Sequence, residues 1–387
     1  MKNFLKRTWA EINLDALLHN FNTIRNFAKC DIAAVVKADA YGHGAKIVSK
    51  VLPARHTKLL AVATLEEAIE LRLARSTKPI LILGHTPADY SYILKQYDLI
   101  QTIHSIEYAR ELSEHAVSYG VTFSCHIKID TGMSRIGFNC REDGAFSKDE
   151  LLECASLKNL SITGIYTHFA TADRSGDQNG EFTKAQFKRF TAVCKFLEEN
   201  GVEIKCKHCC NSAAIMLDED KHLDMSRLGI MLYGLTPDAN LELTLPIEPV
   251  MTLKTLVTQV KQIKKGDCVS YGRTFKAEKD MTVATLSVGY ADGYPRSLSN
   301  RGEVIIREKR AKIIGTVCMD QIVVDVSDID GVKPEDEVIL FGKDLSVDEI
   351  AKLCGTINYE IVCGISRRVP RVYYKNGKIY DVINYLN

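Results

Sequence analysis

The first residues that could do chemistry lie between Ala33 and Gly44, where an apolar run delivers a single lysine, Lys37. Small residues flank this lysine, and a tyrosine and two glycines follow it. The run is typical of a buried parallel strand, and burial lowers the pKa of a lysine, which makes its amine nucleophilic. Such an amine can bond a carbonyl cofactor, although a strand-end lysine whose head reaches water is an equally good interpretation.

Further polar side chains follow the later apolar runs, and they are Lys128, Asp130, Arg135, His168, Asn211, Ser212, Arg227 and the pair Gly229-Ile230. Ser212 and the pair Gly229-Ile230 predict a phosphate site, because a hydroxyl can donate to phosphate oxygen and glycine allows close backbone approach. Ser212 also suits the N-cap of a helix. Both interpretations can hold, since a helix N-terminus attracts anions.

The elements that position these residues alternate between two patterns. Eight short apolar runs predict strands, at Ala33–Val36, Leu59–Ala63, Pro79–Leu83, Leu99–Ile103, Ser124–Ile129, Ile162–Thr167, Glu203–His208 and Met225–Gly229. Helical spacing recurs between or before them, as at Leu14–Ala28, Leu65–Leu71 and Ala185–Leu197. This predicts an α/β fold, a (β/α)8 TIM barrel, with a doubly wound open sheet as the alternative. In both, the chemistry belongs at the carboxyl ends of the strands.

The pattern changes after about Leu235, and a second, mostly-β domain is expected. Its β-branched runs are Met281–Val288, Gly302–Ile306, Ile313–Val317, Ile322–Val326 and Val338–Phe341. Leu241–Pro249, with two prolines, is a plausible crossing segment. We therefore expect a barrel over residues 1–240, whose short N-terminal segment can pack on the other domain, and a β-rich domain over 241–387.

Composition excludes several classes of protein. The 387 residues carry 50 Lys+Arg against 49 Asp+Glu, which gives no reason to expect nucleic acid or an anionic membrane as a partner. No apolar run is long enough to span a membrane, and no signal peptide is evident. The 12 cysteines are expected to be reduced thiols of a cytoplasmic protein. Cys206–Cys210 contains a C-x-x-C but lacks a second pair, so no metal site is expected.

A set of motifs runs in order over nearly the whole chain. They are VKADAYGHG from Val36, KIDTGMSRIG from Lys128, THFA from Thr167, CNSAA from Cys210, RLGI from Arg227, VSYG from Val269, GYADGY from Gly289, CMDQ from Cys318 and INYE from Ile357. In these stretches the chain resembles the alanine racemases, which are barrel-fold enzymes that depend on pyridoxal 5'-phosphate. Jointly the motifs are highly specific.

The resemblance implies a two-base racemisation of L- and D-alanine that supplies D-alanine for peptidoglycan. Lys37 would hold the cofactor and act as the base for the D-enantiomer, and Tyr271 would be the base for the L-enantiomer. Two opposed bases are the minimal design, because a proton must leave one face and return on the other. Tyr271 would come from the partner subunit, so the resemblance implies a homodimer with shared active sites.

The resemblance implies roles for further residues. Arg227 would face the pyridine nitrogen, oriented by His168, and Arg135 would bind the cofactor's phenolic oxygen and the substrate carboxylate beside a carbamylated Lys128. The phosphate would be held by Tyr41, Ser212, Gly229, Ile230 and Tyr359, and the substrate pocket would include Met319 and Asp320. Tyr290, Arg296 and Asp173 would line the entrance. One departure is Thr316, where relatives often carry a basic residue that pairs with an acid, here Asp173.

Three other functions compete with this one. A racemase that favours serine, or accepts many amino acids, is the nearest, although Tyr359 favours alanine mildly. A non-catalytic pyridoxal-phosphate carrier shares the barrel and the lysine, but such proteins end after the barrel, whereas this chain continues and supplies Tyr271. An amino-acid decarboxylase would need a different cysteine-aspartate arrangement in the second domain.

Overall fold

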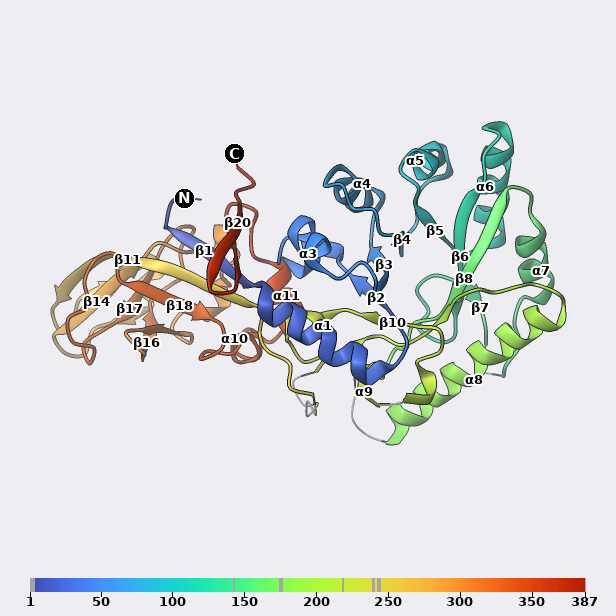
Figure 1. Cartoon of the computed structure of the whole chain (residues 1–387). Coiled ribbons are helices and arrows are strands. Elements are labelled where there is room, and N and C mark those ends of the chain that lie inside the picture. The colour runs from blue at the N-terminus through green and yellow to red at the C-terminus, as the bar shows by residue number, and fades with distance from the viewer. Residues whose placement is uncertain are drawn as a thin grey trace.

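The computed structural model describes residues 4–141, 143–173, 177–217, 219–238, 241 and 245–386. Two parts lie side by side, a parallel barrel with surrounding helices and a largely antiparallel β domain (Figure 1). One cluster of buried apolar side chains extends through both, from Ile32 and Leu60 in the barrel to Val304 and Leu340 in the second part. The two parts therefore share a continuous core.

The predicted eight-stranded barrel is confirmed. Its strands follow the order β10-β2-β3-β4-β5-β6-β8-β9, and every neighbouring pair is parallel. The bounds are Asp31–Val35 (β2), Thr57–Val62 (β3), Ile80–Ile82 (β4), Ile100–Ile103 (β5), Phe123–Asp130 (β6), Leu160–Tyr166 (β8), Lys207–His208 (β9) and Met225–Leu228 (β10). The ring is nearly closed between β9 and β10 by two backbone hydrogen bonds. These run from Asp224 N to Lys207 O (3.2 Å) and from Arg227 N to Cys210 O (3.1 Å).

Helices cover the outside of the barrel. They are Leu14–Ala28 (α1), Ala45–Val51 (α3), Leu65–Leu73 (α4), Ser91–Gln96 (α5), Ile106–Ser118 (α6), Lys148–Ser156 (α7), Asp177–Glu199 (α8) and Ser212–Leu217 (α9), while Lys37–Tyr41 (α2) is a left-handed turn that follows β2. Several begin at side-chain caps: Asn13 accepts from two amides of α1, Thr64 from α4 and Ser105 from α6. The three helices predicted from spacing all form.

The second domain is built on a nine-stranded sheet in the order β14-β17-β16-β15-β18-β11-β1-β19-β20. The bounds are Thr8–Asn13 (β1), Met251–Ile263 (β11), Met281–Leu286 (β14), Glu303–Ile306 (β15), Lys309–Ile314 (β16), Ile322–Asp325 (β17), Glu337–Phe341 (β18), Arg371–Lys375 (β19) and Lys378–Ile383 (β20). All five predicted runs contribute strands. The N-terminal β1 lies between β11 and β19, so the chain begins in this sheet.

Shorter elements complete the two domains. Phe138–Asn139 (β7) pairs with β6, and Cys268–Val269 (β12) pairs with Phe275–Lys276 (β13). Two helices follow β18, Val347–Cys354 (α10) and Asn358–Cys363 (α11). The boundary expected after residue 240 and part of the expected crossing segment, residues 242–244, lie outside the described residues. No helix in the described part of the chain is long and apolar enough to cross a bilayer.

Candidate active site at the barrel mouth

Lys37 begins a turn with an unusual backbone. It lies two residues after β2, and the next four residues, Ala38 to Tyr41, have φ between 51° and 55°. Left-handed backbone costs about 1–2 kcal/mol per non-glycine residue, so surrounding contacts must stabilise it. Gly42 ends the turn at φ 79°, where a Cβ would lie only 2.2 Å from the carbonyl oxygen of Val362. The turn holds Lys37 and Tyr41 at the same end of the barrel.

The Lys37 amine lies in a setting that favours its neutral form. Burial lowers its pKa, and the positive charges of Arg135 and Arg227 lower it further, while Glu67 and Cys363 act in the opposite direction. A neutral amine has a free electron pair, so the side chain is suited to attack a carbonyl carbon.

Arg227 lies on β10 and is fully engaged at its two terminal nitrogens. Nη1 donates to His208 Nδ1 (2.9 Å) and His208 O (3.2 Å). Nη2 donates to Thr167 O (2.8 Å), Cys209 O (2.9 Å) and His168 Nδ1 (3.1 Å). None of the bonds found among the described residues uses Nε. These five acceptors hold the buried cation in place and leave Nε for a ligand.

These bonds determine the tautomers of three histidines, of which His126 and His208 are buried and His168 is partly buried. A guanidinium only donates, so Nδ1 of His168 and of His208 must accept and their protons reside on Nε2. Nε2 of His208 therefore donates to Nδ1 of His126 at 3.0 Å. Burial, aided by the charge of Arg227, lowers the pKa of His126 to about 4 and holds the pKa values of His168 and His208 well below their usual range. All three rings are neutral near pH 7.

Lys128, on β6, is a second buried amine. Its Nζ lies 5.0 Å from the centre of the Tyr166 ring and donates to Ile129 O at 3.3 Å. Burial, with the charges of Arg227 and Arg135, holds its pKa well below the usual lysine value. This environment therefore also favours the neutral form of the amine.

Asp130 shapes the loop that carries Arg135. Its Oδ1 accepts from the amides of Gly132 (3.0 Å), Met133 (2.9 Å) and Ser134 (3.0 Å), and Oδ2 accepts from Arg135 N at 3.1 Å. Partial burial alone would raise the pKa of this carboxyl, but the four amides lower it below its usual value. The loop is thus fixed at its base, while the Arg135 side chain is exposed.

Three hydroxyl groups and one backbone amide form a cradle, which we define as Tyr41, Ser212, Tyr359 and the amide of Gly229. Ser212 Oγ accepts from Gly229 N at 2.9 Å, and the rings of Tyr41 and Tyr359 lie 6.0 Å apart. A Cβ on Gly229 would lie 3.0 Å from the Tyr41 hydroxyl and 3.5 Å from Ser212 Oγ. Burial raises the pKa of both tyrosines, and Asp173 contributes to the rise at Tyr359. The hydroxyls keep their protons and can donate to an acceptor-only group such as phosphate.

The remaining predicted residues lie together in the second domain. Tyr271 is 74% exposed, Met319 52% and Tyr290 43%. The Thr316 hydroxyl donates to Tyr271 O at 2.8 Å, and the amide of Tyr290 donates to Cys318 O at 3.0 Å. Asp320 pairs with Arg368 at 2.7 Å and Arg296 is exposed.

Part of the second domain extends away from the barrel. The strands β14, β16 and β17 lie at the end of the molecule away from the barrel strands (Figure 1), and Thr316 lies two residues after β16. Among the described residues, Tyr271 has no hydrogen bond to a residue of the barrel.

The comparisons with known proteins agree with one another. Residues 12–237 match the N-terminal domain model of alanine racemase, and residues 250–373 match the C-terminal domain model. The curated alanine racemase of Clostridium tetani is 46% identical over 393 residues and covers 100% of both chains.

The chain belongs to the alanine racemase family.

Solved structures of alanine racemases share the whole fold. The enzyme of Clostridium difficile 630 has a TM-score of 0.94 at 41% identity, and its complex with cycloserine has 0.92 at 40%. Both cover 100% of each chain. Membership of the alanine racemase family makes this protein a racemase, which is an isomerase.

The structure brings most of the predicted barrel residues to one mouth and adds residues that the sequence did not single out. Glu67, His208 and His126 all bond to groups at this mouth. A signal existed for Glu67, because Thr64-x-x-Glu67 is a capping-box pattern. His208 was considered only as part of a cysteine cluster. Those thiols are free, and no group of three or more candidate metal ligands occurs among the described residues.

Proposed function

We propose that this racemase interconverts L- and D-alanine with pyridoxal 5'-phosphate, as a cytoplasmic homodimer that supplies D-alanine for peptidoglycan. One observation carries the proposal: a Lys37 amine whose pKa is lowered, an arginine with a spare Nε and the cradle meet at one barrel mouth. Few cofactors need an amine, a ring-nitrogen partner and a phosphate site together.

The residues at the mouth fit the cofactor by the chemistry of their donors. Lys37 would bond the aldehyde carbon, and the cradle, with the Ile230 amide, would bind the phosphate. Arg227, oriented by His168, would donate from Nε to the ring nitrogen and keep it unprotonated, because an arginine remains a cation at neutral pH. When bound, the cofactor supplies a sink for the electron pair left at the substrate's α-carbon.

The protons are handled by the chain's own side chains. Lys37 Nζ would take the α-proton of D-alanine on one face, and the hydroxyl of Tyr271 would return a proton on the other face, with the roles reversed for L-alanine. The second base would come from the partner subunit, as the resemblance to the family implies, and the 74% exposure of Tyr271 leaves its ring accessible to another chain. Its exposed neighbours Met319, Asp320, Tyr290 and Arg296 would then line the substrate pocket and the entrance, opposite Asp173.

Arg135 would bind the substrate carboxylate, and a modified Lys128 would fix it. The neutral Nζ of Lys128 can attack carbon dioxide, which forms an N–C bond, releases one proton and leaves a carbamate anion. This anion would offset the charges of Arg135 and Arg227. Mass spectrometry of the native protein in bicarbonate should show the added carbon dioxide at Lys128, and an unmodified amine there would contradict the proposal.

Two measurements test the function. The purified protein should show the absorbance of lysine-bound pyridoxal phosphate, and alanine incubated with it in deuterium oxide should exchange its α-proton in both enantiomers. A protein that binds the cofactor but exchanges no proton would be a carrier instead. Values of kcat/KM for alanine and serine decide the substrate, and a ratio in favour of serine would overturn alanine.

A further inference from the structure

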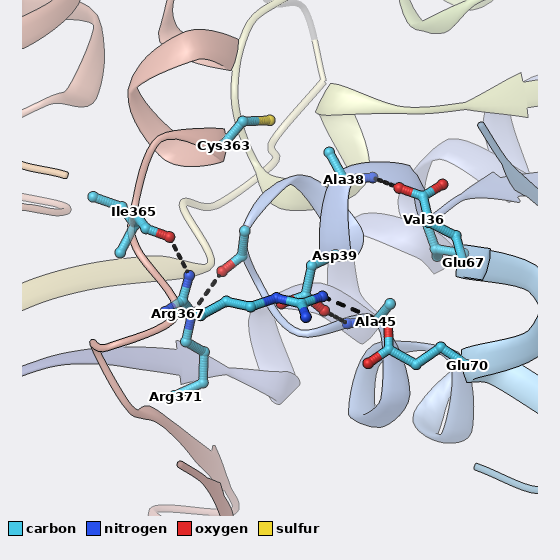
Figure 2. Close-up of a pocket in the computed structure, with 11 residues that line it drawn as sticks. Val36, Ala38, Asp39, Ala45, Glu67, Glu70, Cys363, Ile365, Arg367 and Arg371 are labelled. Atoms are coloured by element: carbon cyan, nitrogen blue, oxygen red, sulfur yellow. Dashed lines mark hydrogen bonds and ion pairs between the residues drawn. The ribbon is translucent and has the colours of Figure 1, made fainter. Parts of the chain in front are cut away.

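Glu67, on α4, bonds to the two strand ends beside Lys37. Its Oε1 accepts from Ala38 N at 2.6 Å and its Oε2 accepts from Ala63 N at 2.7 Å. Figure 2 shows the side chain reaching from its helix to Ala38. In a capping box this glutamate would bond the backbone of Thr64. Here it reaches one residue further back along its own chain, to Ala63, and across to the turn that starts at Lys37.

The same carboxylate is the main negative charge that acts on the Lys37 amine. The groups whose charge or titration bears on Lys37 are Arg135 from the loop after β6, Glu67 from α4, Cys363 from α11, Arg227 from β10 and His168 after β8. Two of these are permanent cations, while the thiol and the imidazole are neutral near pH 7. Glu67 thus balances part of the positive charge that the arginines place around the amine.

We propose that Glu67 is a positioning residue for the cofactor: its carboxylate fixes the left-handed turn between Lys37 and Tyr41, and its charge offsets the arginines that face the Lys37 amine. The inference depends on the proposed function, since it concerns capture of pyridoxal phosphate by Lys37. Glu67 itself is not expected to contact the cofactor.

The position of the Glu67 carboxylate explains why this side chain can fix the turn. The turn has four consecutive non-glycine residues at positive φ, so its first amide needs a fixed acceptor. Asp39 and Arg371 hold the later part, where Asp39 accepts from Ala45 N at 2.7 Å and Arg371 donates to Gly42 O at 2.9 Å. Glu67 alone among these three holds the start of the turn. A hollow of about 250 Å³ behind the turn is lined by Glu67 and both of these residues (Figure 2).

The test measures capture of pyridoxal phosphate by the apoprotein against pH, followed by absorbance. Glu67→Gln removes the charge and replaces one acceptor oxygen by an amide group. Because Glu67 raises the pKa of Lys37, its loss lowers that pKa, so the midpoint of capture should move to a lower pH. Capture at the optimal pH should also slow about tenfold, because the turn is less well fixed.

Two further variants separate the charge from the bonds. Glu67→Asp keeps the charge but is one methylene shorter, so it should slow capture about tenfold with an unchanged midpoint. Glu66→Gln changes the neighbouring exposed glutamate on the same helix and should match the wild type. Should Glu67→Gln not fold, as judged by circular dichroism, the aspartate variant decides, and an unchanged rate in it would overturn the proposal.

The outcomes distinguish this role from the function on which it depends. A wild-type chain that captures no pyridoxal phosphate at any pH would contradict the proposed function. A wild type that captures it, together with a Glu67→Gln variant whose rate and midpoint equal those of Glu66→Gln, would contradict only the role of Glu67.

Discussion

At the barrel mouth Arg227 and Lys128 are 4% and 5% exposed, whereas Tyr271 in the second domain is 74% exposed. Arg227 is held by five acceptors from its own chain, so its burial is compensated. The described contact at Tyr271 is to its backbone carbonyl, from Thr316. One chain therefore fixes the buried groups of its own mouth but leaves the large aromatic side chain of Tyr271 facing solvent.

The difference between the regions lies in what each requires from its own fold. Parallel strands end at the same edge of a barrel, so side chains after β2, β6, β8, β9 and β10 converge without a partner. The second group lies on short turns of the β domain, such as Tyr290–Asp292, and not at the ends of barrel strands. We expect variants in the two regions to differ in their effects on cofactor binding.

The largest effect should come from Lys37→Ala, because it removes the amine that holds the cofactor and serves as one base. Racemisation should fall by about 10³-fold or more, and the protein should not acquire the absorbance of bound pyridoxal phosphate. Lys50→Ala, an exposed lysine on the nearby α3, is the matched control. Cofactor absorbance retained by Lys37→Ala would place the attachment at another lysine.

Tyr271→Phe should lower turnover by about 10²–10³-fold, because it removes one of two proton carriers. Cofactor absorbance and thermal stability should stay unchanged, since the ring is exposed and no bond to its hydroxyl is described. Tyr92→Phe, which alters another half-exposed tyrosine, provides the comparison. Loss of the cofactor in the Tyr271 variant would mean that the two regions are not separable in this way.

Mixing the two inactive proteins sharpens the comparison further. In a dimer with shared sites, one Lys37→Ala chain and one Tyr271→Phe chain form one intact site and one doubly defective site. When equal amounts of the two variants exchange subunits, half of the dimers should be mixed. Each mixed dimer has one intact site of two, so about a quarter of the wild-type activity should return. No recovery in dimers shown to be mixed would indicate that each chain uses its own tyrosine.

Acid should destabilise the barrel region. Burial lowers the pKa of His43 and of His126 to about 4 in the folded chain, against about 6.5 when unfolded. Between these values the unfolded chain binds more protons, so stability falls as pH falls from about 6.5 to 4. Guanidinium unfolding should show a loss of about 4 kcal/mol between pH 7 and 5 from these two groups. His126→Gln should lower the number of protons that the chain takes up on unfolding in this pH range by about one.

The smallest effect is expected at Thr316→Val. This isosteric change removes the bond to Tyr271 O and should cost about 1 kcal/mol of stability, or a few-fold in kcat/KM, if the tyrosine turn loosens. Thr258→Val removes a similar hydroxyl bond, to Thr285 O, in another part of the sheet. Equal effects of the two variants on kcat/KM would show that Thr316 has no special part in placing Tyr271.

Local patterns were enough to predict the barrel and much of the second sheet. A run such as Ile80–Ile82 is apolar because both faces of a parallel barrel strand are covered. The polar residue after such a run must then lie at the mouth, which is why Lys37 and Ser212 could be proposed as site residues. These features depend on periodicity within a few residues.

Other features were decided only by tertiary structure. β1 pairs with β11 and β19, which lie more than two hundred residues later in the sequence, and no local pattern specifies such a partner. The turn from Ala38 to Tyr41 contains no glycine, so its positive φ values depend on bonds from Glu67 and other distant side chains. The sequence by itself determined which residues stand at strand ends, because hydrophobic periodicity is local. The strained turn, the histidine chain and the exposure of Tyr271 depended on long-range packing, whose free energy outweighs local preference.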